Sequence, residues 1–156
     1  MELKFSGSIQ DLSASDRLEL LVDSVTDCAI YLLDRDGVIR TWNPGAERIK
    51  GYRASEIIGQ HFSLFFTAED KAADAPGQIL ARAAGSGRAE QEGWCIRKDG
   101  GQFWASSVVQ PVRDARGRAV GFAKITRDMT ERRQAQQALY ESERRFRLLV
   151  KAVTSQ

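Results

Sequence analysis

The sequence has few of the residues that build metal centres, haem sites and disulfide frameworks. Its 156 residues include one histidine, His61, and two cysteines, Cys28 and Cys95, which lie far apart. That spacing leaves no CxxC pair and no disulfide framework, and it favours a reducing cytoplasm as the location. A histidine-based metal site, or a Ser–His or Cys–His catalytic set, would depend on His61 alone. We therefore expect no metal site and no enzyme activity in this chain.

Long apolar runs and a strong net charge are missing as well. Eighteen consecutive apolar residues do not occur, so we expect no membrane-spanning helix, and the first residues carry no secretory signal pattern. The formal net charge is +2, which is too small to argue for a nucleic-acid partner. Hydrophobic residues make up 42% of the chain and charged residues 28%, as in an ordinary globular domain with a packed core.

The start of the chain predicts a helix followed by a β-hairpin. Residues 1–10 have no clear period and are expected to form a flexible leader. Residues 11–27 carry apolar side chains at helical spacing, which predicts an amphipathic entering helix. Two apolar runs, 28–33 and 38–42, surround an Asp-Gly pair, a pattern that is typical of a hairpin.

The remainder of the core predicts short helices and then a meander. Short helices are expected over residues 46–50 and 55–59, and a longer one over 67–84 with a kink or break at Pro76-Gly77. Three extended runs follow, over residues 89–97, 102–113 and 118–127. With the hairpin they give a five-stranded antiparallel sheet with short helices on one face, an α+β fold. This core is expected to occupy residues 28–130, with a pocket between the sheet and the helices.

Residues 131–156 predict a coiled-coil linker, because apolar residues follow a heptad stripe without Gly or Pro. The basic residues of this segment are interpreted as its solvated face, with a membrane-surface helix as the alternative. One small domain cannot bury the apolar stripes of both flanking helices, so we expect a homodimer. The expected dimer stripe consists of Leu18, Leu21, Val25, Ala135, Leu139, Phe146 and Leu149.

The two ends of the chain resemble each other. Residues 17–27 read RLELLVDSVTD and residues 145–155 read RFRLLVKAVTS, with six of eleven positions identical. We interpret the second segment as the start of a following copy of the domain. Chance similarity between two amphipathic helices is the alternative.

Several strings, taken in order, resemble a known family. The string IYLLDRDGVIRTWNPGAERIKGYRASEIIGQ resembles the first half of a PAS domain, and EGWCIRKDGGQFWASSVVQPVRDARGRAVGFAKITRDMTERR resembles the second half. The resemblance is greatest to the PAS sensor modules of bacterial histidine kinases, which often occur in tandem. It implies a PAS fold, a sensory role and a downstream output domain, with a diguanylate cyclase or a chemoreceptor domain as alternative outputs. The phospho-accepting histidine and the ATP-binding glycine motifs of a kinase do not occur in this sequence.

Similar PAS modules hold flavin, haem, a small organic acid, a divalent cation or nothing between the sheet and the short helices. Lys124 is the only cationic residue that we expect near this pocket, and we expect its side chain at the pocket mouth, in contact with solvent. A small or apolar ligand, or a filled core, is expected from the neutral side chains around it. The pocket candidates are Ile30, Leu32, Ile49, Ile58, His61, Phe62, Leu64, Ile79, Cys95, Phe103, Ala105, Ser107 and Thr126.

The resemblance argues against a light-sensing LOV module, the branch of the family with a flavin-reactive cysteine. Phe62 stands at the cysteine position, and Cys95, Ala105 and Thr126 stand where LOV modules hold the flavin ring with amides. Haem ligated by His61, or a loosely bound flavin, remains as an alternative redox or gas sensor, although His61 also suits a capping role. An empty scaffolding core is a third interpretation. Both cysteines are interpreted as structural.

The string DMTER at residues 128–132 resembles the junction at which PAS domains pass into a signalling helix. Asp128, Thr130, Arg132 and Arg133 are the junction candidates. An Asp followed by a Thr at the end of a strand can cap the next helix. Glu131 and the two arginines are expected close enough to pair with Asp128 or with one another, in two alternative arrangements.

Overall fold

A four-stranded antiparallel sheet forms the centre of the molecule in the computed structural model, which describes residues 3–4 and 6–155. The expected leader includes residues 1, 2 and 5, and the expected repeat includes residue 156, all of which lie outside the described residues. The strands occur in the spatial order β1-β4-β3-β2, and every neighbouring pair is antiparallel. Their bounds are Ala29–Asp34 for β1, Ala89–Ile96 for β2, Gln102–Arg113 for β3 and Ala119–Asp128 for β4.

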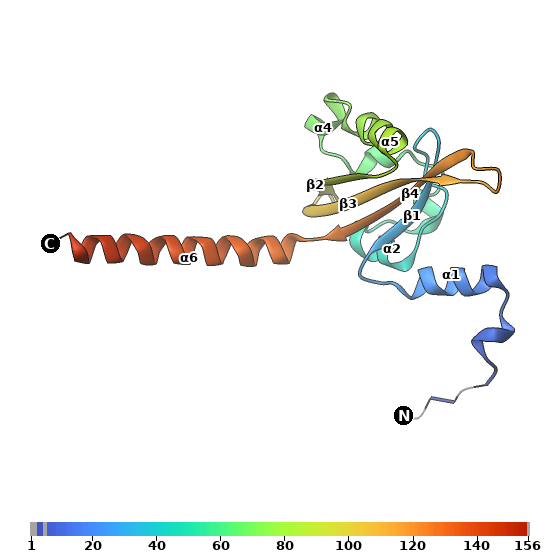
Figure 1. Ribbon diagram of the computed structural model, residues 1–156, viewed down its shortest axis with the longest axis horizontal. Helices are drawn as coiled ribbons and strands as arrows, with labels where there is room; N and C mark the ends of the chain where they lie inside the picture. Colours follow the sequence, from blue (N-terminus) through green and yellow to red (C-terminus); the bar gives the residue numbers. More distant parts are fainter. Residues whose placement is uncertain (1–2, 5, 156) are drawn as a thin grey trace.

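Short helices cover one face of the sheet and confirm the α+β class (Figure 1). The α2 helix packs against β1, and α5 packs against β2 and β3. Alternation along β3 turns Phe103, Ala105, Ser107 and Val109 toward these helices, where all four are buried. The covering elements are α2 (Pro44–Lys50), α3 (Ala54–Ile57), η2 (Phe62–Phe65), α4 (Ala68–Ala72) and α5 (Ala75–Ser86).

The prediction of a fifth strand over residues 38–42 is wrong. Leu33 and Ile39 form an isolated β-bridge flanked by two backbone bonds, from the Asp34 N–H to the Val38 carbonyl and from the Arg40 N–H to the Leu32 carbonyl, each at 2.9 Å. Beyond Arg40, side chains replace the ladder: the Thr41 hydroxyl accepts from the Leu32 N–H, and the Asn43 side-chain carbonyl accepts from the Ile30 N–H, each at 2.9 Å. The segment is thus held to the edge of β1 by one bridge and by side chains, and it does not continue as a fifth strand.

The expected break at Pro76-Gly77 is confirmed as a split between α4 and α5. Thr67 caps α4, since its hydroxyl accepts from the Asp70 N–H at 3.2 Å. Asp74 then adopts a left-handed backbone conformation with φ of 55°, and Pro76 lies in the first turn of α5. Proline suits this position because the first helical N–H groups have no intrahelical acceptor.

Two helices flank the core. After the turn η1 (Ile9–Asp11), α1 (Ala14–Ser24) is capped by Ser13, whose hydroxyl accepts from the Asp16 N–H. The α6 helix (Thr130–Thr154) leaves the end of β4 and extends away from the sheet (Figure 1). Within the described residues, no helix is long and apolar enough to cross a membrane.

Candidate functional site

Seven of the predicted pocket residues meet in the interior beneath the helices. They come from five elements, α2, η2, α5, β3 and β4, so the fold brings distant parts of the sequence to one place. The hydroxyl groups of Ser107 and Thr126 lie 3.2 Å apart, which satisfies both of them away from water. The seven buried residues are Ile49, Phe62, Ile79, Phe103, Ala105, Ser107 and Thr126.

The remaining pocket candidates lie elsewhere. Leu32, Ile58, Leu64 and His61 are exposed. Ile30 and Leu32 are on the face of β1 opposite Tyr31 and Leu33, and they line a groove beside α1. Side chains alternate along a strand, so a pocket assignment that is out by one residue selects the wrong face. Cys95 is half-buried at the border of the interior, and Cys28 is buried.

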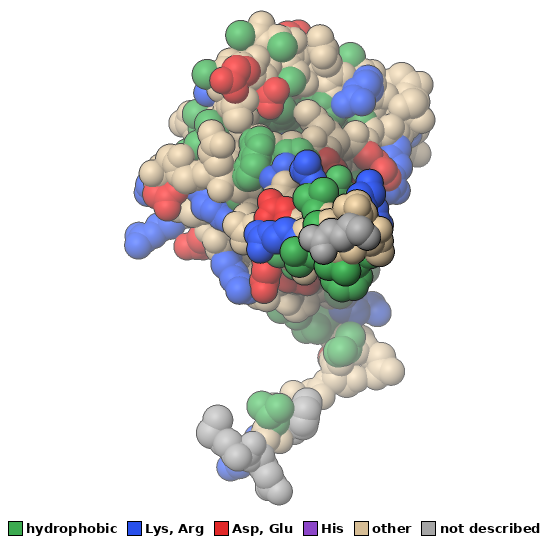
Figure 2. Space-filling view, turned by 90° about the vertical axis from the view of Figure 1, so that its left-hand side faces the viewer, with side chains coloured by type: hydrophobic (Ala, Val, Ile, Leu, Met, Phe, Trp, Pro, Cys, Tyr) green, Lys and Arg blue, Asp and Glu red, His purple; other side chains and the backbone are tan. Residues whose placement is uncertain are grey.

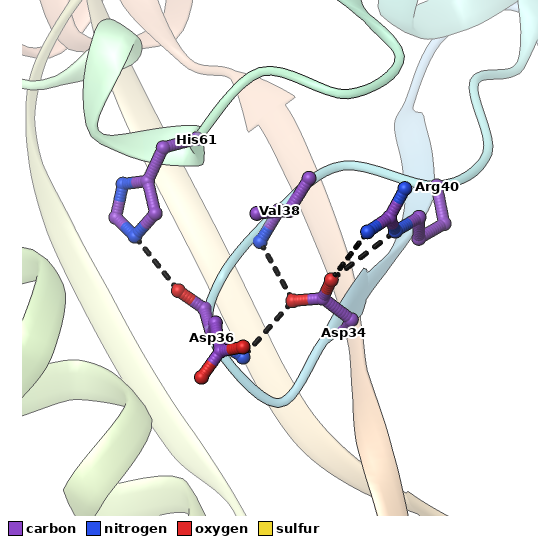
Figure 3. A network of polar contacts seen from close by, with 5 residues as sticks. All are labelled: Asp34, Asp36, Val38, Arg40 and His61. Carbon is purple, nitrogen blue, oxygen red and sulfur yellow. Dashed lines mark hydrogen bonds and ion pairs between the residues drawn. The ribbon is translucent and has the colours of Figure 1, made fainter.

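His61 is a capping residue on the outside of the core (Figure 3). Its Nδ1 accepts from the Ser63 N–H at 3.2 Å, which assigns the proton to Nε2, and Nε2 lies 2.9 Å from the Asp36 carbonyl oxygen. The adjacent turn needs glycine at Gly37, where φ is 87° and a Cβ atom would lie 2.7 Å from Nε2. Both ring nitrogens are therefore engaged, and neither faces the interior.

A small cavity opens between the sheet and α4. It has a volume of about 20 Å³, which is room for about one water molecule. Within the described part of the chain, no group of three or more His, Cys, Asp or Glu side chains is placed to hold a metal ion. The cavity is lined by Phe66, Asp70, Gln91, Gly93, Trp94, Cys95, Ala105, Ser107 and Lys124.

Two lysines lie in this interior, and the expectation that Lys124 is solvated is wrong. Lys124 is 2% exposed and Lys50 is fully buried. Burial lowers the pKa of Lys124 to about 8. Burial, reinforced by the charge of Lys124, also holds the pKa of Lys50 well below its ordinary value. Burial raises the pKa of Tyr31 against a smaller lowering by the nearby Thr126 hydroxyl, but the Tyr31 hydroxyl forms no hydrogen bond of good geometry among the described residues.

A second cluster joins the end of β4 to the start of α6. The Asp128 carboxylate accepts from the Thr130 N–H at 3.0 Å, and the Thr130 hydroxyl accepts from the Trp104 N–H of β3 at 2.9 Å. The Met129 N–H donates to the Trp104 carbonyl at 2.7 Å. The first residue of α6 is therefore bonded both to the strand that precedes it and to the neighbouring strand.

Asp128 pairs with Arg97, which corrects the expectation that it pairs with the arginines of the helix. The Arg97 guanidinium lies 2.6 Å from the Asp128 carboxylate and also donates to the Ile49 carbonyl at the end of α2. Partial burial acts to raise the pKa of Asp128, but the hydrogen bonds from Arg97 and Thr130 outweigh it and lower the pKa below its ordinary value. Arg97 thus links α2, the turn after β2 and the start of α6.

The two junction arginines have different surroundings. Arg133 lies over the rings of Trp104 and Trp94, with its guanidinium carbon 4.4 Å and 5.1 Å from their centroids. The two indole rings meet edge to face at 5.2 Å on the outer side of the sheet. Arg132 is exposed. Cation–π contact with Arg133 is therefore a further attachment of α6 to the sheet.

Three residues outside the predicted site belong to these clusters. Long cationic side chains are ordinarily solvated, so the sequence carries no signal that Arg97 and Lys50 lie in them. For Asn43 the sequence gives one indication, since an Asn directly before a Pro is typical of a residue that caps the start of a helix. Its buried side chain accepts from the Ile30 and Ala46 N–H groups and donates toward the carbonyls of Val25 and Cys28. The segment after α1, β1 and α2 are thereby joined at one amide.

Comparison with known proteins gives matches over most of the chain. A family model described as PAS domain matches residues 27–131. Two-component system protein A of Emericella nidulans is 45% identical over 122 residues, 78% of this chain. The methanogenesis regulatory histidine kinase FilI of Methanothrix harundinacea is 31% identical over 139 residues, 86% of this chain. The crystal structure of the PAS domain of a Colwellia psychrerythraea protein has a TM-score of 0.70 and 26% identity, covering 76% of this chain and 99% of that one.

The two relatives named above are much longer than this chain. The matched region makes up 18% of the Emericella protein and 15% of the Methanothrix protein. What these proteins share with this chain is therefore one module of each.

Proposed function

The chain belongs to the PAS domain family, and on that premise we propose that it is the sensory and dimerisation module of a multidomain signalling protein. It is related to two-component and histidine kinase sensors, and a histidine kinase is the output that this relationship favours. The core converts a ligand-bound or conformational state into a change at the junction of β4 and α6. The α6 helix then passes that change to the output domain.

The observation that carries the proposal is the set of contacts at the start of α6. Arg97 contacts the last turn of α2 and Asp128 together, and Asp128 and Thr130 fix the first residue of α6. A displacement of α2 relative to the sheet must therefore stretch or break a bond at the junction. Such a cluster can exist in two arrangements, which is what a switch requires.

The exposed apolar side chains of the flanking helices support the dimer. Leu18, Leu21, Leu139, Phe146 and Leu149 are each more than half exposed. Figure 2 looks along α6 from its C-terminal end and shows hydrophobic side chains at the surface beside charged ones. The stripe on α6 repeats at heptad spacing, and such stripes are buried by a second helix. Ala135 is exposed on the same helix, whereas Val25 is half-buried after the end of α1.

The repeated segment supports an output that lies further along a longer chain. Residues 145–155 fall in the last part of α6, just as residues 17–27 begin within α1. A single long helix would thus leave one PAS core and enter the next. This arrangement lets α6 transmit a shift in position or rotation without an intervening flexible segment.

The proposal is tested by substituting the two side chains that bond the first residue of α6. Asp128→Ala removes a charge-assisted bond and costs about 2 kcal/mol, and Thr130→Ala costs about 1 kcal/mol. Both losses are small beside a stability of about 5–15 kcal/mol, so the sheet stays folded. Hydrogen exchange should show faster exchange in the first turn of α6 and unchanged protection in β3 and β4.

The output is measured in the multidomain protein by autophosphorylation of the kinase. A loss of 1.4 kcal/mol at a balanced switch changes the ratio of its two states about tenfold, so both variants should shift kinase activity several-fold. Glu141→Ala and Glu143→Ala remove exposed carboxylates further along α6 and should leave the kinase activity unchanged. Wild-type activity in variants whose first turn has loosened would contradict the proposal.

A further inference from the structure

Two ammonium groups and one phenol hydroxyl in the interior lack the partners that burial ordinarily demands. Lys50 is fully buried and Lys124 is 2% exposed. Neither Lys50 Nζ nor the Tyr31 hydroxyl has a hydrogen-bond partner within the described residues. No carboxylate in that part of the chain forms an ion pair within 4 Å of either lysine. Lysine is rarely buried without a counter-charge, so these groups leave an acceptor unaccounted for.

The two lysines face one aromatic cage. Their Nζ atoms lie 5.5 Å and 5.9 Å from the centroid of the Tyr31 ring. Lys50 Nζ is also 3.9 Å from the Phe65 centroid, and Lys124 Nζ is 5.0 Å from that of Phe62. The ring faces stabilise the cations in part, but they accept no directed hydrogen bond of the strength that an anion accepts.

We propose that this interior binds a small organic monoanion, a carboxylate of two or three carbon atoms, through Lys124, Lys50 and the Tyr31 hydroxyl. The inference rests on the proposed sensory function and names the ligand class of that sensor. The carboxylate accepts from the two ammonium groups and the phenol hydroxyl, and its short apolar part contacts the phenylalanine rings. Lys50 loses its proton more readily than Lys124, because its pKa is the more strongly lowered. The remaining positive charge, on Lys124, is matched by a ligand with a single negative charge.

The cavity of about 20 Å³ is lined by Lys124 but not by Lys50 or Tyr31, and it is smaller than the ligand. Binding therefore requires the flexible side chain of Lys124 to shift, which enlarges the cavity toward Tyr31 and Lys50. The other titratable groups near this lysine are Tyr31 on β1, Lys50 on α2, Cys95 on β2 and Asp70 on α4. Asp70 borders the mouth, where its carboxylate disfavours dianions and larger anionic ligands.

The site is coupled to the junction through shared contacts. Lys50 Nζ and the Arg97 guanidinium both lie over the Phe103 ring, at 5.8 Å and 4.3 Å from its centroid. Arg97 also donates to the carbonyl of Ile49, the residue next to Lys50. An anion that draws Lys50 toward itself therefore acts on the same helical turn that positions Arg97 and Asp128.

The test is a calorimetric titration of the 156-residue chain with sodium propionate at pH 7 and constant ionic strength. Propionamide, the neutral analogue of nearly equal shape, is the matched control ligand. We expect one propionate per chain with a Kd in the range of about 0.1–10 mM, in keeping with the small number of ligand atoms, and no binding of propionamide. The affinity should fall about tenfold between pH 7 and pH 9 as Lys124, with its pKa of about 8, loses its charge.

Variants locate the binding. Lys124→Met and Lys50→Met should each weaken propionate binding at least tenfold, and Tyr31→Phe should weaken it several-fold. Lys71→Met removes an exposed ammonium from α4 near the mouth and should leave the affinity unchanged. Circular dichroism of each variant shows whether the fold is retained, and Lys124→Gln repeats the loss of charge in a polar side chain.

Three results would overturn the inference. The first is no binding of propionate or acetate at a ligand concentration 20 times the upper end of the expected Kd range. The others are binding of propionamide as tight as that of propionate, and an unchanged affinity for propionate in both Lys124→Met and Lys50→Met. The proposed function is tested separately, because the junction variants Asp128→Ala and Thr130→Ala are measured without any ligand. Failure of propionate with a working junction removes the ligand class and leaves the sensory role standing.

Discussion

Replacing Lys124 with methionine should make the unliganded domain more stable. The fall in the pKa of this lysine from 10.5 to about 8 corresponds to about 3 kcal/mol at neutral pH, at about 1.4 kcal/mol for each tenfold change in proton affinity. Methionine has a similar length and no charge, but it forfeits a cation–π attraction of about 1 kcal/mol. The net gain should be about 2 kcal/mol, which raises the melting temperature by about 6 °C in a domain of this size.

The sign of the pH dependence follows from the same shift. Above pH 8 the folded protein releases the Lys124 proton, whereas the unfolded chain keeps it until about pH 10.5. The unfolded state therefore binds more protons in this window, and wild-type stability rises with pH. The destabilising effect is fully present below pH 8 and fades as the pH approaches 10.5. The advantage of Lys124→Met should accordingly be largest at pH 7 and nearly absent at pH 10.

Urea unfolding at pH 7, 8, 9 and 10 measures both effects. Tyr31, Lys50, Cys95 and Asp70 face the same interior in both proteins, so the difference between wild type and Lys124→Met isolates this lysine, apart from relief of its repulsion on Lys50, which has the same sign. The surface variant Lys71→Met should track the wild type throughout. A Lys124→Met protein that is less stable than the wild type by an amount independent of pH would refute the buried, unpaired ammonium.

Three further outcomes are expected. Truncation after Arg133 should shift the chain from dimer to monomer in sedimentation velocity at micromolar concentration, since it removes the exposed stripe of α6; a 156-residue chain that is already monomeric would contradict this. Asn43→Ala should cost about 3 kcal/mol in urea unfolding, because it leaves buried N–H and carbonyl groups unpaired, and a loss below 1 kcal/mol would contradict that account. Protein expressed in a flavin-rich host should be colourless and show no bleaching under blue light, because the resemblance to LOV modules puts Phe62 at the position of the reactive thiol.

Elements with a clear period were predictable from the sequence. The strands β2, β3 and β4 begin and end within one residue of the predicted runs, because glycine-containing turns separate the three runs from one another. The split before α5 followed from Pro76, whose ring excludes a continuous helix. These features depend on local backbone chemistry, which a single sequence specifies.

Features that depend on contacts between distant residues were not predictable. The ladder expected over residues 38–42 ends at Arg40, and beyond it the side chains of Thr41 and Asn43 accept from β1 instead. The pairing of Asp128 with Arg97 joins residues 31 positions apart. Nearby arginines in the sequence were the obvious partners for Asp128, yet the helix that carries them points them elsewhere. Which cation reaches a carboxylate is decided by the fold.

Lysine side chains are ordinarily solvated, and the burial of Lys50 and Lys124 departs from that rule in a way that bears on function. A core of this composition would be more stable with methionine or leucine at both positions, since an unpaired buried ammonium costs more than its aromatic contacts return. Marginal stability leaves little room for such a cost unless something offsets it in the working protein. A ligand that binds the folded state offsets it by mass action. Such a ligand also acts on the junction, because Lys124 is part of β4 and Lys50 is the last residue of α2. These are the two elements on which the Arg97–Asp128 pair depends.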